Sequence, residues 1–113
     1  GEMGVALTYY KRAIALDPDY TVAYNNMANL LNDLGRINDA IRHYRHALSI
    51  NPLLFKVHNN LATALIKQKK YGDAIRHLQK ALAINPDYIT ARENLLKINV
   101  IRQTNGALTT ADE

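Results

Sequence analysis

Apolar and polar positions recur with a helical period in three stretches of the chain. In two of them, Ile37–Leu48 and Tyr71–Leu82, the apolar residues follow the same 3-1-3-3-1 spacing. Residues 2–16 have the same phase. Side chains at such intervals share one face of an α-helix. The pattern therefore predicts three amphipathic helices, which we call the B helices.

A second kind of apolar stripe lies between the first. It covers Val22–Leu34 and Lys56–Gln68, and it returns from Ile89 to about Gln103. We call these the A helices, and we expect short polar turns to join each of the first two to the following B helix. The segment Thr104-Asn105-Gly106 is typical of a helix end. We therefore expect residues 105–113 to form a flexible tail.

Prolines punctuate the pattern at a fixed interval of 34 residues. Pro18, Pro52 and Pro86 close the phrases Ala-Leu-Asp-Pro, Ser-Ile-Asn-Pro and Ala-Ile-Asn-Pro. Because proline disfavours helix in the residue before it, each B helix should end there. A repeat of this length stacks helical units side by side, and the surface that remains usually binds another protein.

Composition narrows the picture to one all-α domain. The 113 residues include 48% hydrophobic residues, five glycines and three prolines. No run approaches the roughly 20 apolar residues of a membrane span, and the start is unlike a signal peptide, so we expect a cytoplasmic protein. Without cysteine there are no disulfides or thiolate metal sites. The net charge of +4 is small and spread over several helices, which argues against specific nucleic-acid binding.

The repeat resembles the tetratricopeptide repeat, which has a large aromatic residue early in helix A, a leucine and a small residue mid-helix, two alanines in helix B and a final proline. The matching residues are Tyr24, Met27-Ala28, Ala40, Ala47 and Pro52 in one repeat and His58, Leu61-Ala62, Ala74, Ala81 and Pro86 in the next. His58, Arg92 and Leu96 depart from the pattern. The resemblance implies a right-handed α-solenoid of order B-AB-AB-A.

On that basis the chain divides into a half repeat (1–20), two full repeats (21–54 and 55–88) and a terminal A helix (89–104). The resemblance also implies that the A helices line a concave groove. The groove residues that we expect to bind a peptide are Asn25, Asn26, Asn29, Asn32, Lys56, Asn59, Asn60, Thr63, Lys67, Asn94 and Lys97.

Asparagine dominates this predicted groove, although it is a mediocre helix former that costs about 0.5–0.7 kcal/mol relative to alanine. A carboxamide offers both a donor and an acceptor, so a ladder at Asn26, Asn60 and Asn94 can hold the backbone of an extended peptide. The ladder resembles that of repeat domains that present substrates to the glycosyltransferase adding N-acetylglucosamine to proteins. The alternative is that these asparagines bond to one another or to water.

The sequence argues against other chemistry. A clamp for the C-terminal carboxylates of chaperones needs cations where this chain has Asn25, Thr90 and Asn94. His43 and His46 have no carboxylate partner nearby, and the equivalent places in the other repeats hold Tyr9, Arg12, His77 and Lys80, so a solvated outer face is favoured over a metal site for all three histidines. We interpret His58 as a packing residue. No nucleophile with a base and no phosphate-binding loop is present, so we expect neither catalysis nor a cofactor.

We therefore expect a protein-interaction scaffold. Two alternatives stay open: a fragment of a larger enzyme that recruits substrates, and a self-assembling scaffold. Residue 1 falls at the turn between helices A and B, so each end holds half a repeat and head-to-tail homo-oligomers are expected. The residues predicted to lie uncovered at the two ends are Met3, Leu7, Tyr10, Leu95, Leu96, Ile98 and Ile101.

Overall fold

Six α-helices make up the computed structural model, which describes residues 1–112 and the side chains of residues 1–105. The described residues contain no strand. The helices are α1 (Glu2–Leu16), α2 (Thr21–Asp33), α3 (Ile37–Ile50), α4 (Phe55–Lys67), α5 (Tyr71–Ile84) and α6 (Ile89–Asp112). The predicted order is thus confirmed, with α1, α3 and α5 as B helices and α2, α4 and α6 as A helices.

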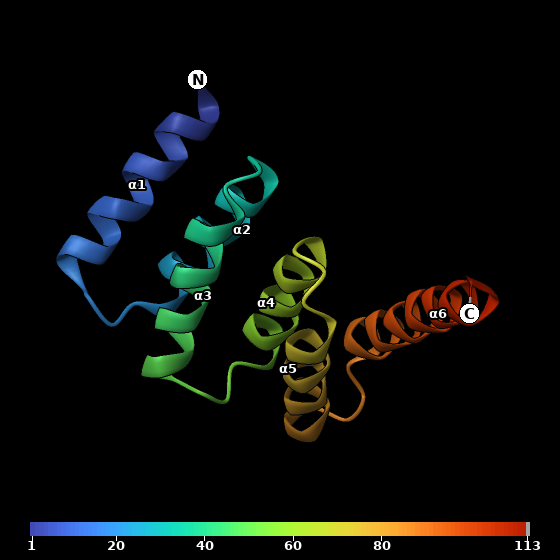
Figure 1. Ribbon diagram of the computed structural model, residues 1–113. Helices are drawn as coiled ribbons and strands as arrows, with labels where there is room; N and C mark the ends of the chain where they lie inside the picture. Colours follow the sequence, from blue (N-terminus) through green and yellow to red (C-terminus); the bar gives the residue numbers. More distant parts are fainter. Residues whose placement is uncertain (113) are drawn as a thin grey trace.

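Each helix packs mainly on its neighbours in the chain. The pairs α2–α3 and α4–α5 make the most extensive contacts, while α1 packs on α2, α3 on α4 and α5 on α6. The A helices also touch one another, α2 with α4 and α4 with α6. The result is an elongated stack of 56 × 32 × 20 Å with the two termini at opposite ends (Figure 1). This is the all-α helical-repeat solenoid that the sequence predicts.

The last helix is longer than predicted. The sequence places a stop at Thr104–Gly106, but α6 continues to Asp112, so this boundary is wrong. One glycine inside a helix costs only about 1 kcal/mol relative to alanine, which does not break an otherwise regular helix. Flexibility of residues 105–113 stays a prediction, and Glu113 lies outside the described residues.

The turns between paired helices share one left-handed residue. Gly35 has φ 81° and Lys69, which lies 34 residues later, has φ 60°. In each turn the next backbone N–H reaches back five residues: that of Arg36 donates to the Leu31 carbonyl at 2.9 Å, as the Lys70 N–H does to the Leu65 carbonyl. This pattern closes the C-terminus of an α-helix.

The residues at the position where the repeat pattern has an aromatic residue in helix A all make the same kind of hydrogen bond. The Tyr24 hydroxyl donates to the Pro18 carbonyl at 2.9 Å, and Arg92 donates to the Pro86 carbonyl at 2.7 Å. In the middle repeat Nε2 of His58 lies 2.8 Å from the carbonyl of Pro52. Tyrosine, histidine and arginine all supply a donor that reaches the turn before their own helix, which explains why these departures are tolerated.

Small residues allow the helices to approach. Ala28, Ala40, Ala62 and Ala74 are completely buried, as expected where helices cross closely. They belong to one continuous apolar core that extends from α2 to α6, with α1 packed on it through half-buried side chains. The A-helix face, with its asparagines, lies on this shared core.

Candidate functional site

Three side-chain bridges join the A helices. The Asn60 amide donates to Oδ1 of Asn25 at 3.1 Å, and the Asn94 amide donates to Oδ1 of Asn59 at 2.9 Å. Nζ of Lys67 donates to Oδ1 of Asn32 at 3.0 Å. Each bridge connects a residue with the one 35 positions later. We call these six residues, together with Asn26 beside Asn25 on α2, the amide row.

The bridges do not join the three members of the predicted ladder to one another. Asn26, Asn60 and Asn94 hold equal places in successive repeats, yet Asn60 and Asn94 bond to the places of Asn25 and Asn59 instead. Two parallel helices contact each other through opposite sides, so side chains at equivalent positions of successive repeats cannot point toward each other. A step of one residue along an α-helix rotates the side chain by about 100°, so a residue one position away points toward the neighbouring helix.

The amide row retains free hydrogen-bonding capacity. A carboxamide has two donor hydrogens and two acceptor lone pairs, and one bridge uses only one of these on each partner. Within the described residues, no second bond engages the Asn25 amide nitrogen or the Asn60 amide oxygen. Asn26 is half-buried, and its side chain makes no hydrogen bond to any described residue. These groups can still bind a polypeptide backbone.

Asn29 and Thr63 hold the same place in the two full repeats but bond inside their own repeat. The Asn29 amide oxygen accepts from the Tyr44 hydroxyl, which links α2 to α3. Burial, with a smaller contribution from the Asp33 charge, raises the pKa of Tyr44, so its hydroxyl stays protonated as a donor. Thr63 donates to the Asn60 carbonyl at 2.6 Å. Both side chains brace the face structurally.

The predicted groove residues differ in how far they reach solvent. The half-buried ones are Asn25, Asn26, Asn29, Asn60, Thr63 and Asn94. Asn32 and Asn59 are buried as acceptors of the bridges, so they are poorly placed to contact a ligand. The three lysines, Lys56, Lys67 and Lys97, are exposed. Whether these residues bind a peptide stays a prediction.

The predicted self-association residues divide in the same way. Met3 and Leu96 are exposed, whereas Leu7, Tyr10, Leu95 and Ile101 are half-buried. Ile98 is completely buried, so the prediction that it lies uncovered is wrong. It belongs to the shared core, because it lies on the side of α6 that packs on α4 and α5.

Two histidines expected on a solvated outer face are partly covered. The ring of His43 lies 6.2 Å from that of Tyr24, and His77 stacks on His58 at 5.3 Å. The expectation fails because these B-helix places face helix A of the same repeat. His46 is exposed, with its ring 4.4 Å from Tyr24. The packing role predicted for His58 is confirmed, since its side chain is buried.

The His58–His77 pair is held in its neutral form. Their Nδ1 atoms are 3.1 Å apart, which requires one to donate and the other to accept. Because His58 uses Nε2 to reach Pro52, its Nδ1 is the acceptor and His77 donates. Burial, followed by the charge of a protonated His58, lowers the pKa of His77 to about 4. Burial also lowers the pKa of His58, against the opposing effect of its bond to Pro52.

A cavity of about 330 Å³, which the sequence did not predict, lies between the N-terminal parts of α2 and α4. Its lining residues are Thr21, Val22, Asn25, Leu53, Leu54, Phe55, Lys56 and Val57. One signal for it was present in the sequence, because Leu53 occupies the place of Asp19 and Asp87 in the other repeats. Asn25 belongs both to this cavity and to the amide row.

Other site types receive no support from the described part of the chain. It contains no group of three or more histidine, cysteine or acidic side chains that could hold a metal ion. None of its helices is long and apolar enough to cross a membrane. The arrangement of the A-helix face offers hydrogen bonds, lysine charges and an apolar cavity, which are the means of binding another polypeptide.

Comparison with known proteins agrees with this geometry. A family model for the tetratricopeptide repeat matches residues 19–87. The chain therefore belongs to the tetratricopeptide repeat family. No curated protein gives a significant match to the chain.

Solved structures share the fold at low sequence identity. The first TPR of Spaghetti (RPAP3), bound to the HSP90 peptide SRMEEVD, has a TM-score of 0.86 at 21% identity and covers 91% of this chain and 82% of that one. MamA has a TM-score of 0.80 at 24% identity over 94% of this chain and 60% of its own. A mutant of the Thermobaculum terrenum O-GlcNAc transferase gives 0.81 at 24% identity over 87% of this chain, but only 19% of its own length.

Proposed function

We propose that this chain is a protein-interaction module that binds an extended segment of a partner protein along the amide row. The single observation that carries the proposal is the set of unused amide groups at Asn25, Asn26 and Asn60 on adjacent helices. Such groups can pair with the N–H and C=O of a peptide whatever its side chains. The family supports the class of function, and the solved neighbour that holds a peptide supports this kind of ligand.

The composition of α2 supports a role outside folding. Asn25, Asn26, Asn29 and Asn32 all lie within this one helix of 13 residues. Each costs about 0.5–0.7 kcal/mol of helix stability relative to alanine. Bridges engage Asn25 and Asn32, and Asn29 accepts from Tyr44, but Asn26 receives no compensating bond among the described residues. Binding to a partner accounts for its presence.

The same binding face fits a recruiting domain within a larger protein. The neighbouring transferase contains a similar array as a small part of its length. In that arrangement the row would hold a substrate segment for chemistry performed elsewhere. The contact with the bound segment would be the same as in an independent binding module, and only its consequence, the recruitment of a substrate, would differ.

Replacement of single asparagines tests the proposal. Heptapeptides selected from a random phage library on the whole chain provide the probes. Asn26→Ala and Asn60→Ala should each weaken the selected peptides about fivefold, which corresponds to roughly 1 kcal/mol per lost hydrogen bond. Asn99→Ala is the matched control, because Asn99 is exposed on α6 outside the row. Equal affinities for the Asn26, Asn60 and Asn99 variants would remove the row from the mechanism.

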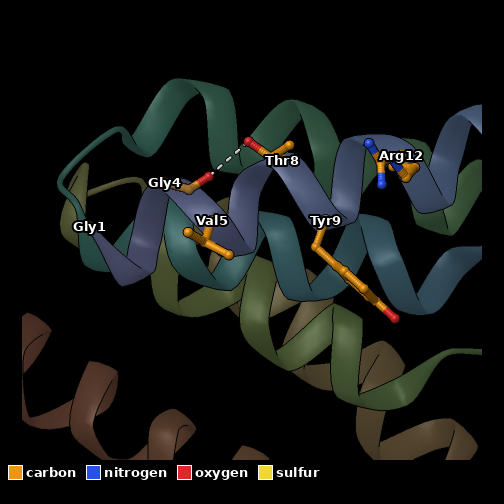
Figure 2. A pocket seen from close by; sticks show the side chains of 6 residues that line it. All are labelled: Gly1, Gly4, Val5, Thr8, Tyr9 and Arg12. Atoms are coloured by element: carbon orange, nitrogen blue, oxygen red, sulfur yellow. Dashed lines mark hydrogen bonds between the residues drawn. The ribbon is translucent and has the colours of Figure 1, made fainter.

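We propose self-association as a second function of residues 1–113, supported by exposed apolar side chains on both terminal helices. Val5 and Tyr9 line a hollow of about 420 Å³ on α1, with Gly1, Gly4, Thr8 and Arg12 (Figure 2). On α6, Leu96 and Val100 are 60% and 61% exposed.

Repeat equivalence supports a particular fit of the two faces. In the full repeats the aromatic place of helix A lies against the residue 19 positions later, as Tyr24 does against His43 and His58 against His77. In a repeat composed of two molecules, Arg92 of one would meet Tyr9 of the other. Arginine over a tyrosine ring is a favourable cation–π contact.

A further inference from the structure

The cavity between α2 and α4 has apolar walls that are open to solvent. Val22 on α2 is 50% exposed, and Leu53 in the loop before α4 is 67% exposed. Leu54 and Phe55 are half-buried behind them, and the buried Val57 closes the set of apolar lining residues. A volume of about 330 Å³ falls at the lower end of the range of ligand sites. Such a volume can take an apolar side chain of a partner segment.

This junction breaks the pattern of its own repeats. The turn after the proline reads Asp-Tyr at Asp19-Tyr20 and again at Asp87-Tyr88, but Leu-Leu at Leu53-Leu54. In all three turns the backbone N–H of the first of these residues donates to the side chain two positions earlier. The turn thus accepts aspartate in two repeats, and the leucine is not needed for its geometry. Leu53 lines this site together with the exposed Val22, and an exposed apolar patch of several side chains favours contact with another molecule.

The charge at the cavity indicates what that molecule carries. Of the eight lining residues, only Lys56 is charged, and its side chain is exposed. Because Leu53 stands where the other two repeats have aspartate, this site lacks the carboxylate that those repeats carry. Asn25 adds its free amide hydrogens at the end of the cavity that meets the amide row. An apolar pocket with a cation and an amide donor is complementary to an apolar side chain that has a carboxylate beside it.

We propose that this cavity anchors a partner segment by a leucine-sized apolar side chain whose neighbouring residue is aspartate or glutamate. The apolar group fills the space between Val22 and Leu53, the carboxylate pairs with the Lys56 ammonium, and the backbone continues onto the amide row through Asn25. This inference rests on the proposed function, because it assumes that an extended peptide follows the A helices. It adds the residue that sets the register of that peptide.

Leu53→Asp is the decisive variant. It installs the residue that both sister repeats carry, so the turn should fold normally, while the cavity loses a wall and gains a repelling charge. The probe is acetyl-Gly-Glu-Leu-Glu-Gly-amide, titrated into the ¹⁵N-labelled chain and followed by NMR. We expect shifts at the backbone amides of Val22, Asn25 and Phe55, and binding about tenfold weaker in Leu53→Asp. Asp87→Leu, the reverse exchange in the next repeat, is the control and should leave binding unchanged.

Two further probes test the chemistry. Replacement of the probe's leucine by serine should abolish the shifts, and replacement of its glutamates by lysine should weaken binding about tenfold. Equal binding of the glutamate and lysine probes, equal affinity for the chain and its Leu53→Asp variant, or shifts confined to other residues would each overturn the proposal.

The outcome is separable from that of the proposed function. If Leu53→Asp weakens the probe but Asn26→Ala does not weaken the selected heptapeptides, the anchor stands and the amide row fails. If Asn26→Ala weakens the heptapeptides while Leu53→Asp leaves the probe unaffected, the row stands and the anchor fails.

Discussion

The stacked imidazoles of His58 and His77 connect α4 to α5 through a contact that a proton disturbs. The single hydrogen between the two Nδ1 atoms satisfies both rings when both are neutral. A second proton would place two donors against each other, near the charges of Lys80, Arg45 and Arg76. The middle repeat therefore holds a pH-sensitive pair of imidazoles that the first full repeat, with Tyr24 at the place of His58, lacks.

Acid should weaken the fold through this pair. The pKa of His77 is about 4 in the folded chain and about 6.5 when unfolded, so the unfolded state binds more protons between these values. The stability that this pair contributes is fully present above pH 6.5 and is lost as the pH falls toward 4. Because the group is only half-buried, we expect about 1 kcal/mol, or about 5 °C in Tm.

Thermal melts at pH 7.5 and pH 4.5 measure this effect against the variant His77→Phe. The phenyl ring retains the stacking area but cannot take up a proton, so the variant should lose less stability in acid than the parent. Other groups also titrate between these pH values. Their contributions cancel when the acid-induced stability losses of the two chains are subtracted. Identical acid-induced losses in both would show that the pair does not control the response.

At the scale of single residues, the sequence predicts the kind of side chain better than its partner. It identifies the asparagine-rich face and the alternative that its asparagines bond to one another, but it does not predict that Asn60 bonds to Asn25. A repeat interval carries no information on how neighbouring helices are offset. The donor shared by Tyr24, His58 and Arg92 was hidden for a similar reason, because only coordinates show that the preceding carbonyl lies within reach.

At the scale of helices, the turn from α4 to α5 contains an avoidable strain. Lys69 adopts the left-handed conformation at the place where the first full repeat has Gly35. A residue with a Cβ costs roughly 1–2 kcal/mol there, and part of the gain from glycine is lost to the greater freedom of the unfolded chain. Lys69→Gly should therefore stabilise the fold by about 0.5–1 kcal/mol, measured by urea denaturation. Lys70→Gly, where φ is −89°, is the control and should destabilise it.

The close crossings of the helices give a second prediction at this scale. Ala40 and Ala74 have no exposed surface, so enlargement of either to leucine should overpack the core and cost about 1–3 kcal/mol. Arg42→Ala should cost far less, because it removes only an exposed ion pair with Asp39. Thermal melts decide the point, and similar Tm values for Ala40→Leu and Arg42→Ala would mean that the helix faces are misassigned.

Helix boundaries follow closely from sequence where local chemistry sets them. The predicted B helix at residues 2–16 has those bounds in the structure, because the backbone before Pro18 is extended and ends the helix. The predicted A helices are displaced by one residue, since Leu34 and Gln68 turn out to be caps. The end of α6 was the error, since no proline follows and Gly106 alone does not stop a helix.

At the scale of the whole molecule, the solenoid combines the face that we propose for binding with two unlike ends. The A-helix face bears the amide row and the cavity at Leu53, both held by helices with a common core. The terminal helices α1 and α6 each pack on one side only, and their outer sides bear Val5, Tyr9, Leu96 and Val100 in exposed positions. In a stack of repeats, such surfaces are complementary when the register agrees.

Association of residues 1–113 through these ends is the last prediction. The α6 face of one molecule and the α1 face of another would compose a whole repeat, so the apparent mass should rise with concentration in sedimentation velocity. Leu96→Lys with Val100→Lys should restore the monomer, because two charges would enter an apolar contact. Ile89→Lys is the matched control: Ile89 is 64% exposed on the same helix but lies outside the hollow formed by Leu96, Lys97, Val100 and Ile101. A chain that stays monomeric at all concentrations, or three proteins with the same concentration dependence, would exclude assembly through these faces.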